Sequence, residues 1–268
     1  MSLLWHERYV AALSPTRVAL IGRGRALVGE HDCIGGDSPA WAAPTLALGE
    51  LLAGNRARRG SLDVVLSGQF ARFCLLPWSE DIGSRDELDA YARIRFEELY
   101  GAAAAGWSVC VAPAPVGHPR LAAAIDGGLR ARLQELAAAA GARLNSVQPY
   151  LTVAFDRLRR WMRDDDFMFV VAESGRGSVL AARDGRWLSV RSTAGVEGAP
   201  ALATLIERES EMLGYEVGAM PSVYLHDPGR ARGEAPGAVR GVVPVRLNLP
   251  RASGASTSPV RAMAEACS

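Results

Sequence analysis

The stretch Phe167-Met-Phe-Val-Val-Ala-Glu-Ser-Gly-Arg-Gly-Ser-Val-Leu180 decides the fold, because its pattern also occurs earlier, as Tyr9-Val-Ala-Ala-Leu-Ser-Pro-Thr-Arg-Val-Ala-Leu-Ile21. Each stretch is an apolar run, a tight polar turn and a second apolar run, which indicates two antiparallel strands. A third strand is predicted after each, at residues 26–28 and 187–190. Two such meanders, separated by about half the chain, predict two related lobes.

The composition is typical of a soluble globular protein. The chain has 268 residues, of which 49% are hydrophobic and 22% are charged, and its formal net charge is +1. This length is enough for one large domain or two modest ones. The near-neutral charge gives no electrostatic reason to expect nucleic-acid binding. Every apolar run is too short to span a bilayer and no charged segment precedes a signal-like core, so we expect a cytoplasmic protein.

Two residue types exclude particular chemistries. The sequence contains no lysine, so all 30 of its basic residues are arginine. A Walker A loop and a lysine Schiff-base enzyme both need the lysine amine, and both are therefore excluded. The cysteines lack the CxxC spacing of a zinc site and lie far apart, which favours reduced thiols over disulfides or metal ligands. They are Cys33, Cys74, Cys110 and Cys267.

Strands and helices alternate outside the two meanders. Apolar periodicity and capping residues predict helices at 44–53, 84–101, 126–141, 148–158 and 199–214. Further strands are predicted at 62–66, 70–76, 107–112, 120–125, 143–147, 222–225 and 241–247. Because only a short turn at Ser67-Gly68 separates them, strands 62–66 and 70–76 are predicted to form a hairpin.

The pattern of strands followed by helices restarts after the polar turn Arg163-Asp-Asp-Asp166. We therefore predict a first lobe at residues 1–163 and a second lobe at 164–249. From residue 250 onward Ser, Ala, Gly and Pro predominate, which predicts a disordered tail over 250–268. The predicted fold class is α/β, with two lobes of mixed sheets flanked by helices.

In this order of elements the chain resembles the actin-like proteins of bacterial pilus and secretion machines. These include the PilM-like type IV pilus assembly proteins, MshI and the cytoplasmic domain of GspL. Besides the two meanders, the resemblance rests on Leu75-Leu-Pro-Trp78, Ala140-Gly-Ala142, Ser146-Val-Gln-Pro149, Thr152-Val-Ala154, Leu205-Ile-Glu-Arg-Glu-Ser210 and Val223-Tyr-Leu225. It covers residues 5 to 228 and implies a two-lobed actin-like (ribonuclease H-like) fold.

The resemblance implies that a nucleotide phosphate would lie between the two meander turns. In actin-like ATPases the first turn carries Asp-x-Gly, which supplies a carboxylate for the metal-bound water and lets backbone N–H groups approach phosphate. The matching Leu13-Ser-Pro-Thr16 has no carboxylate and no glycine, and Pro15 lacks an N–H donor. We therefore expect a degenerate site that binds ATP and Mg²⁺ weakly or not at all, and no ATP hydrolysis.

The second turn keeps more of the phosphate-binding pattern. Glu173, Ser174, Gly175 and Gly177 supply an acid, a hydroxyl and two glycines, so they are the candidate phosphate-binding residues. Gly and Ser also favour an ordinary solvent-exposed hairpin turn, and both interpretations stay open.

The part of the site that would bind adenosine also keeps less of the family's pattern. The family has a glycine pair after a strand, whereas His226-Asp-Pro-Gly229 supplies a single glycine. The resemblance places Glu207 and Glu209 near the base or ribose of any bound nucleotide. Glu209 falls in the apolar stripe of its helix, so its carboxylate lies either at the mouth of a cleft or at the edge of the buried face.

We assign no catalytic residue and no metal site. The four histidines have no metal or triad spacing, and Asp164 to Asp166 are consecutive carboxylates that point in different directions, as in a solvated turn. His226-Asp227, at the end of a strand, is the least implausible catalytic pair, but a capping or turn role suits it better.

The resemblance implies a cytoplasmic scaffold, held at the inner membrane by a bitopic PilN-like partner whose tail it binds in a groove of the first lobe. A homodimer is compatible with this function. The alternative is an actin-fold kinase or phosphotransferase with Glu173 as its metal-linked carboxylate. That enzyme needs an acid between the lobes and a glycine turn in the first lobe, which supplies neither. An unrelated binding function on the same fold stays open.

Overall fold

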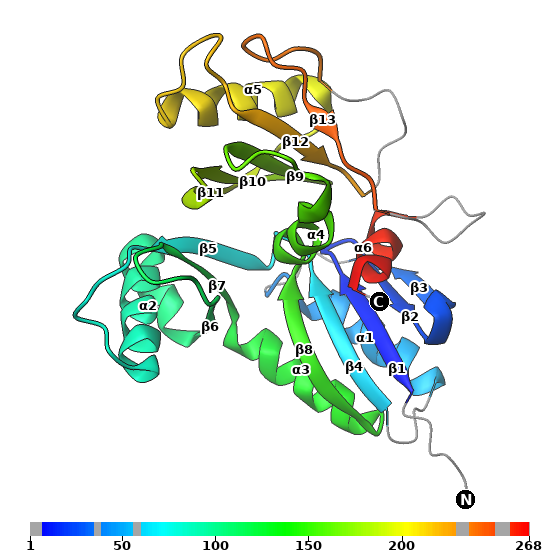
Figure 1. The fold of residues 1–268 in the computed structure, drawn as a ribbon. Helices are drawn as coiled ribbons and strands as arrows, with labels where there is room; N and C mark the ends of the chain where they lie inside the picture. Colours follow the sequence, from blue (N-terminus) through cyan, green and yellow to red (C-terminus); the bar gives the residue numbers. More distant parts are fainter. Residues whose placement is uncertain (1–6, 35–38, 56–59, 229–235, 250–257, 268) are drawn as a thin grey trace, which may run out of the picture. The chain divides into compact units, whose positions relative to one another are not determined.

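The structure, a computed structural model, describes residues 7–34, 39–55, 60–228, 236–249 and 258–267. They form two compact units, each assembled from separate stretches of the chain (Figure 1). The first unit takes the described residues that fall within 1–70, 126–153 and 250–268, and the second takes those within 71–125 and 154–249.

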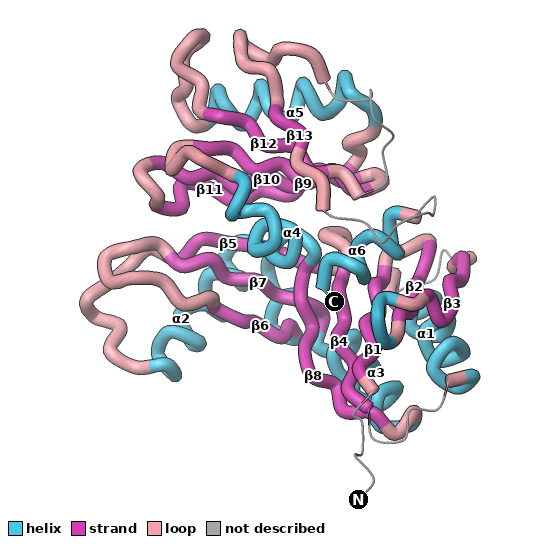
Figure 2. The backbone as a smooth tube through the Cα atoms, turned by 45° about the vertical axis from the view of Figure 1, so that its right-hand side comes forward, coloured by secondary structure: helices cyan, strands magenta, loops and turns pink. Residues whose placement is uncertain are grey.

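The first unit is built on a five-stranded mixed sheet with the order β3-β2-β1-β4-β8. Its strands are β1 (Arg8–Leu13), β2 (Arg17–Ile21), β3 (Leu27–Asp32), β4 (Gly60–Leu66) and β8 (Ala142–Pro149). Helices α1 (Ala42–Gly54) and α3 (Gly127–Ala139) cover one face, and α6 (Pro259–Cys267) packs against β1, β2 and β4 on the other (Figures 1 and 2). Because both faces are covered, the central strands are continuous apolar runs.

The second unit holds two sheets. A three-stranded sheet with the order β5-β7-β6 packs on α2 (Arg85–Tyr100). A five-stranded sheet with the order β11-β10-β9-β12-β13 packs on α5 (Gly198–Met212). The strands are β5 (Ala71–Leu76), β6 (Trp107–Val111), β7 (Arg120–Asp126), β9 (Phe167–Glu173), β10 (Arg176–Arg183), β11 (Arg186–Ala194), β12 (Ser222–His226) and β13 (Val245–Arg246).

Strand β9 is apolar from residue 167 to residue 172 because its two faces belong to different cores. Met168 and Val170 pack in the cluster under α5. Phe167 and Phe169 point the other way, where Phe155 of α4 (Tyr150–Leu158) lies 5.9 and 5.6 Å from their ring centroids. Successive side chains of a strand alternate between its faces, so a strand buried on both sides shows no polar alternation.

The predicted starts of two helices are confirmed. At the start of α2 the Ser84 hydroxyl accepts a hydrogen bond from Glu87 N at 3.2 Å, while Glu87 Oε2 accepts one from Ser84 N at 2.9 Å. At the start of α3 Asp126 Oδ1 accepts from Gly128 N at 2.7 Å and from Leu129 N at 3.2 Å. Each cap satisfies backbone donors that have no partner inside the helix.

The predicted hairpin of strands 62–66 and 70–76 is wrong. β4 pairs in parallel with β1 and β8, whereas β5 pairs antiparallel with β7 in a different sheet. Two apolar runs around a short turn look alike in sequence whether they pair with each other or with distant strands. β4 is almost fully buried, so it needs a partner on each side, which a hairpin alone does not provide.

The predicted disordered tail over 250–268 is wrong for residues 259–267, which form α6. Val260, Met263, Ala264 and Cys267 are all buried, and their i, i+3, i+4, i+7 spacing gives the short helix one apolar face. Small residues lower the apparent hydrophobicity of this segment, but strands β1, β2 and β4 supply the apolar surface against which it folds. Residues 250–257 lie outside the described part of the chain.

The two compact units also divide the chain differently from the predicted lobes 1–163 and 164–249. The predicted boundary falls inside the second unit, just before β9. Its polar turn behaves as a turn: Asp164 accepts from the Tyr224 hydroxyl at 2.8 Å, and Asp165 pairs with Arg159 at 3.0 Å. A pattern that repeats along the chain does not report which stretches pack together.

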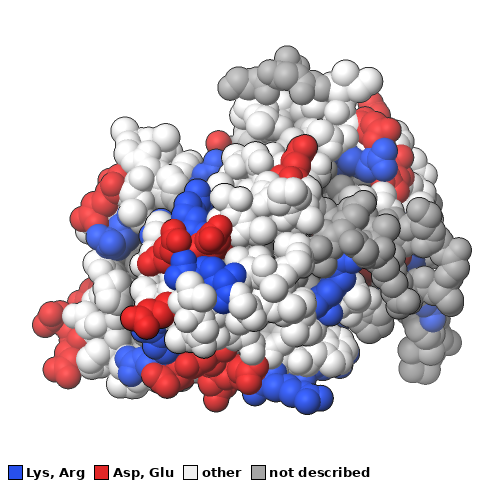
Figure 3. All heavy atoms as spheres, turned by 90° about the horizontal axis from the view of Figure 1, so that it is seen from above, with Lys and Arg blue, Asp and Glu red and all other residues white. Residues whose placement is uncertain are grey.

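Surface charges are mixed in sign. On the face drawn in Figure 3, acidic and basic side chains lie among one another. Some form pairs along one helix, such as Arg85 with Asp89 and Arg132 with Glu135, each at 3.0 Å. Such exposed pairs contribute little to stability.

A buried carboxylate joins three strands and the C-terminal helix of the first unit. Asp63 in β4 accepts hydrogen bonds from Arg8 Nε at 2.7 Å, Asn145 Nδ2 at 2.7 Å and Ser146 Oγ at 2.6 Å. Arg8 also donates to the Cys267 carbonyl in α6 at 3.2 Å. Burial alone raises the pKa of Asp63, but these hydrogen bonds and the charge of Arg8 outweigh it and hold the pKa below its usual value.

We expect Asp63→Asn to lower the free energy of unfolding by about 1–3 kcal/mol at neutral pH, because it removes the charge opposite Arg8 and half of the acceptor capacity. The carboxylate's stabilisation is present above the unfolded-state pKa, about 3.9, and is lost as the pH falls through the lower folded-state pKa. In urea unfolding at pH 3 to 7, the wild type and the variant should therefore converge at low pH. Asp32→Asn, at an exposed ion pair, is the control. A stability difference independent of pH would contradict this prediction.

Candidate functional site

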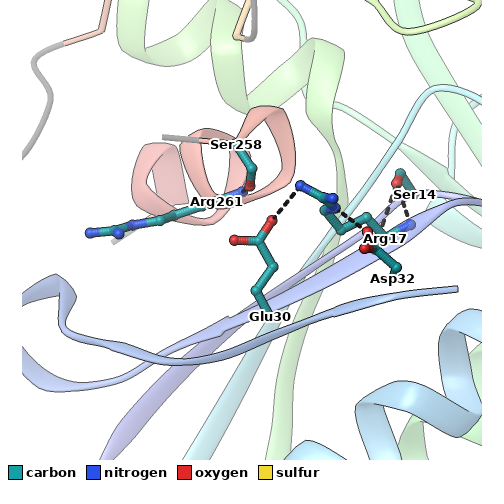
Figure 4. Close-up of polar contacts among 6 residues, drawn as sticks. All are labelled: Ser14, Arg17, Glu30, Asp32, Ser258 and Arg261. Carbon is teal, nitrogen blue, oxygen red and sulfur yellow. Dashed lines mark hydrogen bonds and ion pairs between the residues drawn. The ribbon is translucent and has the colours of Figure 1, made fainter. Parts of the chain in front are cut away.

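The turn between β1 and β2, the first expected phosphate turn, is closed by Ser14 (Figure 4). The Ser14 hydroxyl accepts from Arg17 N at 3.1 Å and donates to Arg17 O at 3.0 Å, and Ser14 N donates to the same carbonyl at 2.9 Å. The polar groups of Ser14 are thus used within the turn, and Pro15 has no N–H to offer.

Arg17, at the end of this turn, is engaged by two carboxylates of β3. Its Nε lies 2.5 Å from Asp32 Oδ1, and its Nη1 lies 3.3 Å from Glu30 Oε1 (Figure 4). The hydrogen bond to Asp32 is the main reason that the pKa of Arg17 is raised. The pairing with these two carboxylates directs the Arg17 guanidinium toward β3.

The second turn is a two-residue hairpin turn. Glu173 ends β9, Arg176 begins β10, and the two face each other in the strand register. Between them Ser174 is exposed and Gly175 has φ +69°, a left-handed conformation that favours glycine in tight hairpins. Glu173 is 7% exposed. Three of the candidate residues are therefore adjacent, and the hairpin by itself accounts for the glycine.

Gly177 has a packing function. A Cβ built on it would lie 2.4 Å from Leu205 Cδ2 and 3.2 Å from the methyl groups of Val196. The side chains of Leu205 in α5 and of Val196 therefore pack directly on the backbone of Gly177, in space that a Cβ would fill. This contact explains the second glycine of the turn motif without a ligand.

We expect Gly177→Ala to lower the free energy of unfolding by about 1–3 kcal/mol, because the new methyl group overlaps Leu205 in a packed core. Gly106→Ala is the matched control. Its Cβ would have no atom within 4 Å, and we expect a change of about 0.5 kcal/mol or less. Chemical denaturation of both variants measures this. Equal stability of Gly177→Ala and the wild type would contradict the packing function.

Glu207 and Glu209, expected near a base or ribose, lie in different environments. Glu207 is exposed on α5, whereas Glu209 is completely buried. The two Glu209 oxygens lie 3.2 Å from Arg191 Nε and 3.3 Å from Arg208 Nη2. Burial raises the pKa of Glu209, and the two guanidinium groups only partly oppose this. Positions two apart on a helix differ by about 200°, so these carboxylates do not act together.

The arginines that hold Glu209 also line a pocket that sequence reasoning missed. It has a volume of about 630 Å³ and lies in the second unit, among β5, α2, β10, β11 and α5. Its lining contains five arginines and no acidic residue: Arg72, Arg95, Arg176, Arg191 and Arg208. These arginines come from five elements spread over more than half the chain, so no spacing rule in the sequence could have grouped them.

Arg176 of this pocket has charges of both signs nearby. Burial lowers its pKa and the positive charge of Arg72 lowers it further, while the charge of Glu173 opposes both. Its Nη1 donates to Ser192 Oγ at 3.1 Å, while its buried Nε has no hydrogen-bond partner among the described residues. Arg95 forms an ion pair with Glu98 outside the pocket lining. The carboxylates that act on these arginines, among them Glu98, Glu173 and Glu209, therefore lie just outside the pocket lining.

The cysteines, the possible metal ligands and His226 show no arrangement typical of a catalytic site. All four cysteines are free, and burial raises the pKa of the Cys74 thiol to about 11, so this thiol is a poor nucleophile. Within the described ranges, no group of three or more His, Cys, Asp or Glu side chains has a geometry able to hold a metal ion. The Nδ1 of His226 lies 2.9 Å from the Leu247 carbonyl, so this ring nitrogen has a partner within the fold. No helix among the described residues is long and apolar enough to cross a membrane.

The sequence matches no protein-family model and no curated protein. Solved structures do match. The chain is similar to the cytoplasmic domain of EpsL, an inner-membrane component of the type II secretion system of Vibrio cholerae. The identity is 14% and the TM-score 0.56, over 97% of this chain and 94% of that one. It is also similar to a chain of the PilM–PilN type IV pilus biogenesis complex, with 16% identity and a TM-score of 0.60, over 90% and 88%.

A third similar structure is a Bacteroides thetaiotaomicron protein of unknown function with an actin-like ATPase fold. Its identity is 10% and its TM-score 0.54, over 85% of this chain and 84% of that one. At these identities the similarity establishes the fold. The chain has the actin-like ATPase fold, as its resemblance to the pilus and secretion proteins implied.

Proposed function

We propose that this chain is an assembly scaffold of a type IV pilus or type II secretion-like machine, which binds the tail of an inner-membrane partner and does not hydrolyse ATP. Its fold, shared with EpsL and with a chain of the PilM–PilN complex over most of their lengths, supports the scaffold function. Fold alone does not imply function. The proposed absence of ATP hydrolysis therefore rests on the two turns that bind nucleotide in actin-like ATPases.

The main observation against ATP hydrolysis is that the turn at Ser14 is closed by its own hydrogen bonds. An actin-like ATPase needs a carboxylate and approachable backbone donors there, and this turn has neither. Its hydroxyl and amide are bonded to Arg17, and the next residue is proline. In the second turn Gly175 and Gly177 are both explained by hairpin geometry and packing. The lack of a carboxylate and of approachable backbone donors in the first turn also counts against a kinase that uses Glu173.

The proposed partner is a bitopic, PilN-like protein of the inner membrane. PilN is the partner named in one similar complex, and EpsL is itself an inner-membrane component. The scaffold would then act on the cytoplasmic side of that membrane, held there by the partner's tail. A tail of this kind binds by adding backbone hydrogen bonds and apolar anchors to a groove.

We expect calorimetric titration of the full chain with Mg-ATP to show no saturable heat up to about 1 mM, the upper end of ordinary enzyme KM values. The same titration of Glu173→Ala should be indistinguishable, because Glu173 has no ligand to lose. Saturable binding by the wild type that Glu173→Ala abolishes would contradict the degenerate site. It would favour the phosphotransferase instead.

We expect a synthetic peptide with the N-terminal cytoplasmic residues of a bitopic inner-membrane protein encoded beside this chain to bind saturably. Fluorescence anisotropy with a labelled peptide measures this, and a scrambled peptide of the same composition is the control. Binding of the intended sequence alone supports the scaffold. Equal binding of both peptides, or a neighbourhood of metabolic genes without a bitopic protein, would contradict it.

A further inference from the structure

Helix α6 carries its own polar contacts. Ser258, just before the helix, accepts a hydrogen bond at its Oγ from Arg261 N at 3.2 Å and at its carbonyl from Ala262 N at 3.0 Å. One turn further on, Arg261 Nε lies 2.9 Å from Glu265 Oε1. The start of the helix is thus capped by the residue before it, and its ion pair lies within the helix. Because these contacts join residues of one segment, α6 keeps them wherever it docks.

The sheet face beneath α6 is apolar and has small residues at its centre. A Cβ built on Gly29 would lie 2.4 Å from Leu51 in α1, so Gly29 and its strand partner Leu20 face α1. Side chains alternate along a strand, so Ala19 faces α6, together with its partner Ala12 in β1. We call this face the docking face. Its buried apolar residues are Val10, Ala12, Ala19, Ile21 and Val65.

The docking face has order that does not come from α6. Its strands are paired within a five-stranded sheet, and α1 and α3 cover the opposite face. Hydrogen bonds from Arg8, Asn145 and Ser146 to Asp63 join β1, β4 and β8 directly. This network reaches α6 through Arg8, which donates to the Cys267 carbonyl at 3.2 Å. The bonds between strands do not include α6, so they remain when the helix leaves.

The contact that holds α6 is small. Its buried apolar side chains are Val260 and Met263 together with the smaller Ala264, Ala266 and Cys267. Hydrophobic stabilisation follows the apolar area that is buried, and small side chains bury little. A helix of nine residues is also not stable alone in water. Release and unfolding of α6 are therefore one local event, of the kind that needs less free energy than global unfolding.

We propose that α6 is an exchangeable element, which docks on its own chain or on the docking face of a second copy, so that two copies form a reciprocal dimer. Both arrangements use the same residues and the same contacts, which is the condition for exchange of an element between identical chains. Within one chain α6 has the advantage of a high effective concentration. The dimer is therefore favoured at high protein concentration, or when docking within one chain is blocked. The exchange does not depend on the proposed scaffold function.

A complementation experiment with two full-length variants tests the exchange. Met263→Asp places a charge on the buried side of α6 and leaves the docking face intact. Ala12→Leu fills the docking face and leaves α6 intact. Neither variant can dock its own helix, so each alone should have the mass of one chain by light scattering. Their equimolar mixture should have the mass of two chains, because the intact helix of one docks on the intact face of the other.

Met212→Asp is the matched control, because Met212 is exposed in α5 and receives the same charge. Its mixture with Ala12→Leu should remain monomeric. A Met263→Asp and Ala12→Leu mixture that stays monomeric up to about 1 mM, the order of the effective concentration of a tethered segment, would overturn the proposal. Loss of the cooperative thermal transition in Met263→Asp would also overturn it, because exchange requires a docking face that stays folded without α6.

A labelled peptide of residues 258–267 separates a second copy from other occupants. By anisotropy it should bind Met263→Asp about tenfold or more tightly than it binds the wild type, whose own α6 competes. A peptide with the Met263→Asp change should not bind. Binding of the intact peptide without dimers in the mixture of variants would overturn the exchange, in favour of a docking face for the helix of a different protein.

Amide hydrogen exchange of the wild type gives an independent readout. The amides of α6 should exchange about tenfold or more faster than those of β4 in the same unit, because α6 opens locally. Equal protection of α6 and β4 would mean that the helix leaves only when the whole unit unfolds, and it would overturn the proposal.

Discussion

Burial of both faces of the sheet β3-β2-β1-β4-β8 is the constraint on which the first unit depends. β1, β2 and β4 are buried on both faces over most of their length, so each face needs a cover. Helices α1 and α3 supply one cover early in the chain, and α6, the last described element, supplies the other. The hydrogen bonds among Asp63, Arg8 and the Cys267 carbonyl fix that return of the chain.

The two meander turns illustrate how one fold supports different functions. In both, the strands and the tight reversal are kept, which is what the sheet requires. What a phosphate would need, namely open backbone donors and a carboxylate, is replaced in the first turn by bonds between Ser14 and Arg17. In the second, Gly177 serves the contact with Leu205. Packing thus constrains the strands and the tight reversals, whereas nothing in the packing requires a turn that binds phosphate.

The pocket lined by five arginines shows how buried charges are balanced. Burial and the charge of Arg72 lower the pKa of Arg176, while the charge of Glu173 opposes both. Glu209 is completely buried and lies between Arg191 and Arg208. Charges of opposite sign thus offset part of the cost of removing one another from water.

The sequence by itself determined the α/β class, the two meanders and the capped starts of α2 and α3, because these depend on neighbours within a few residues. Only the tertiary structure decided that β4 and β5 belong to different sheets and that residues 259–267 fold on the first unit. The pocket lined by five arginines is likewise decided by the tertiary structure. Partners of a strand, the surface beneath a short helix and the meeting of distant charges are set by contacts across the chain, which local patterns do not encode.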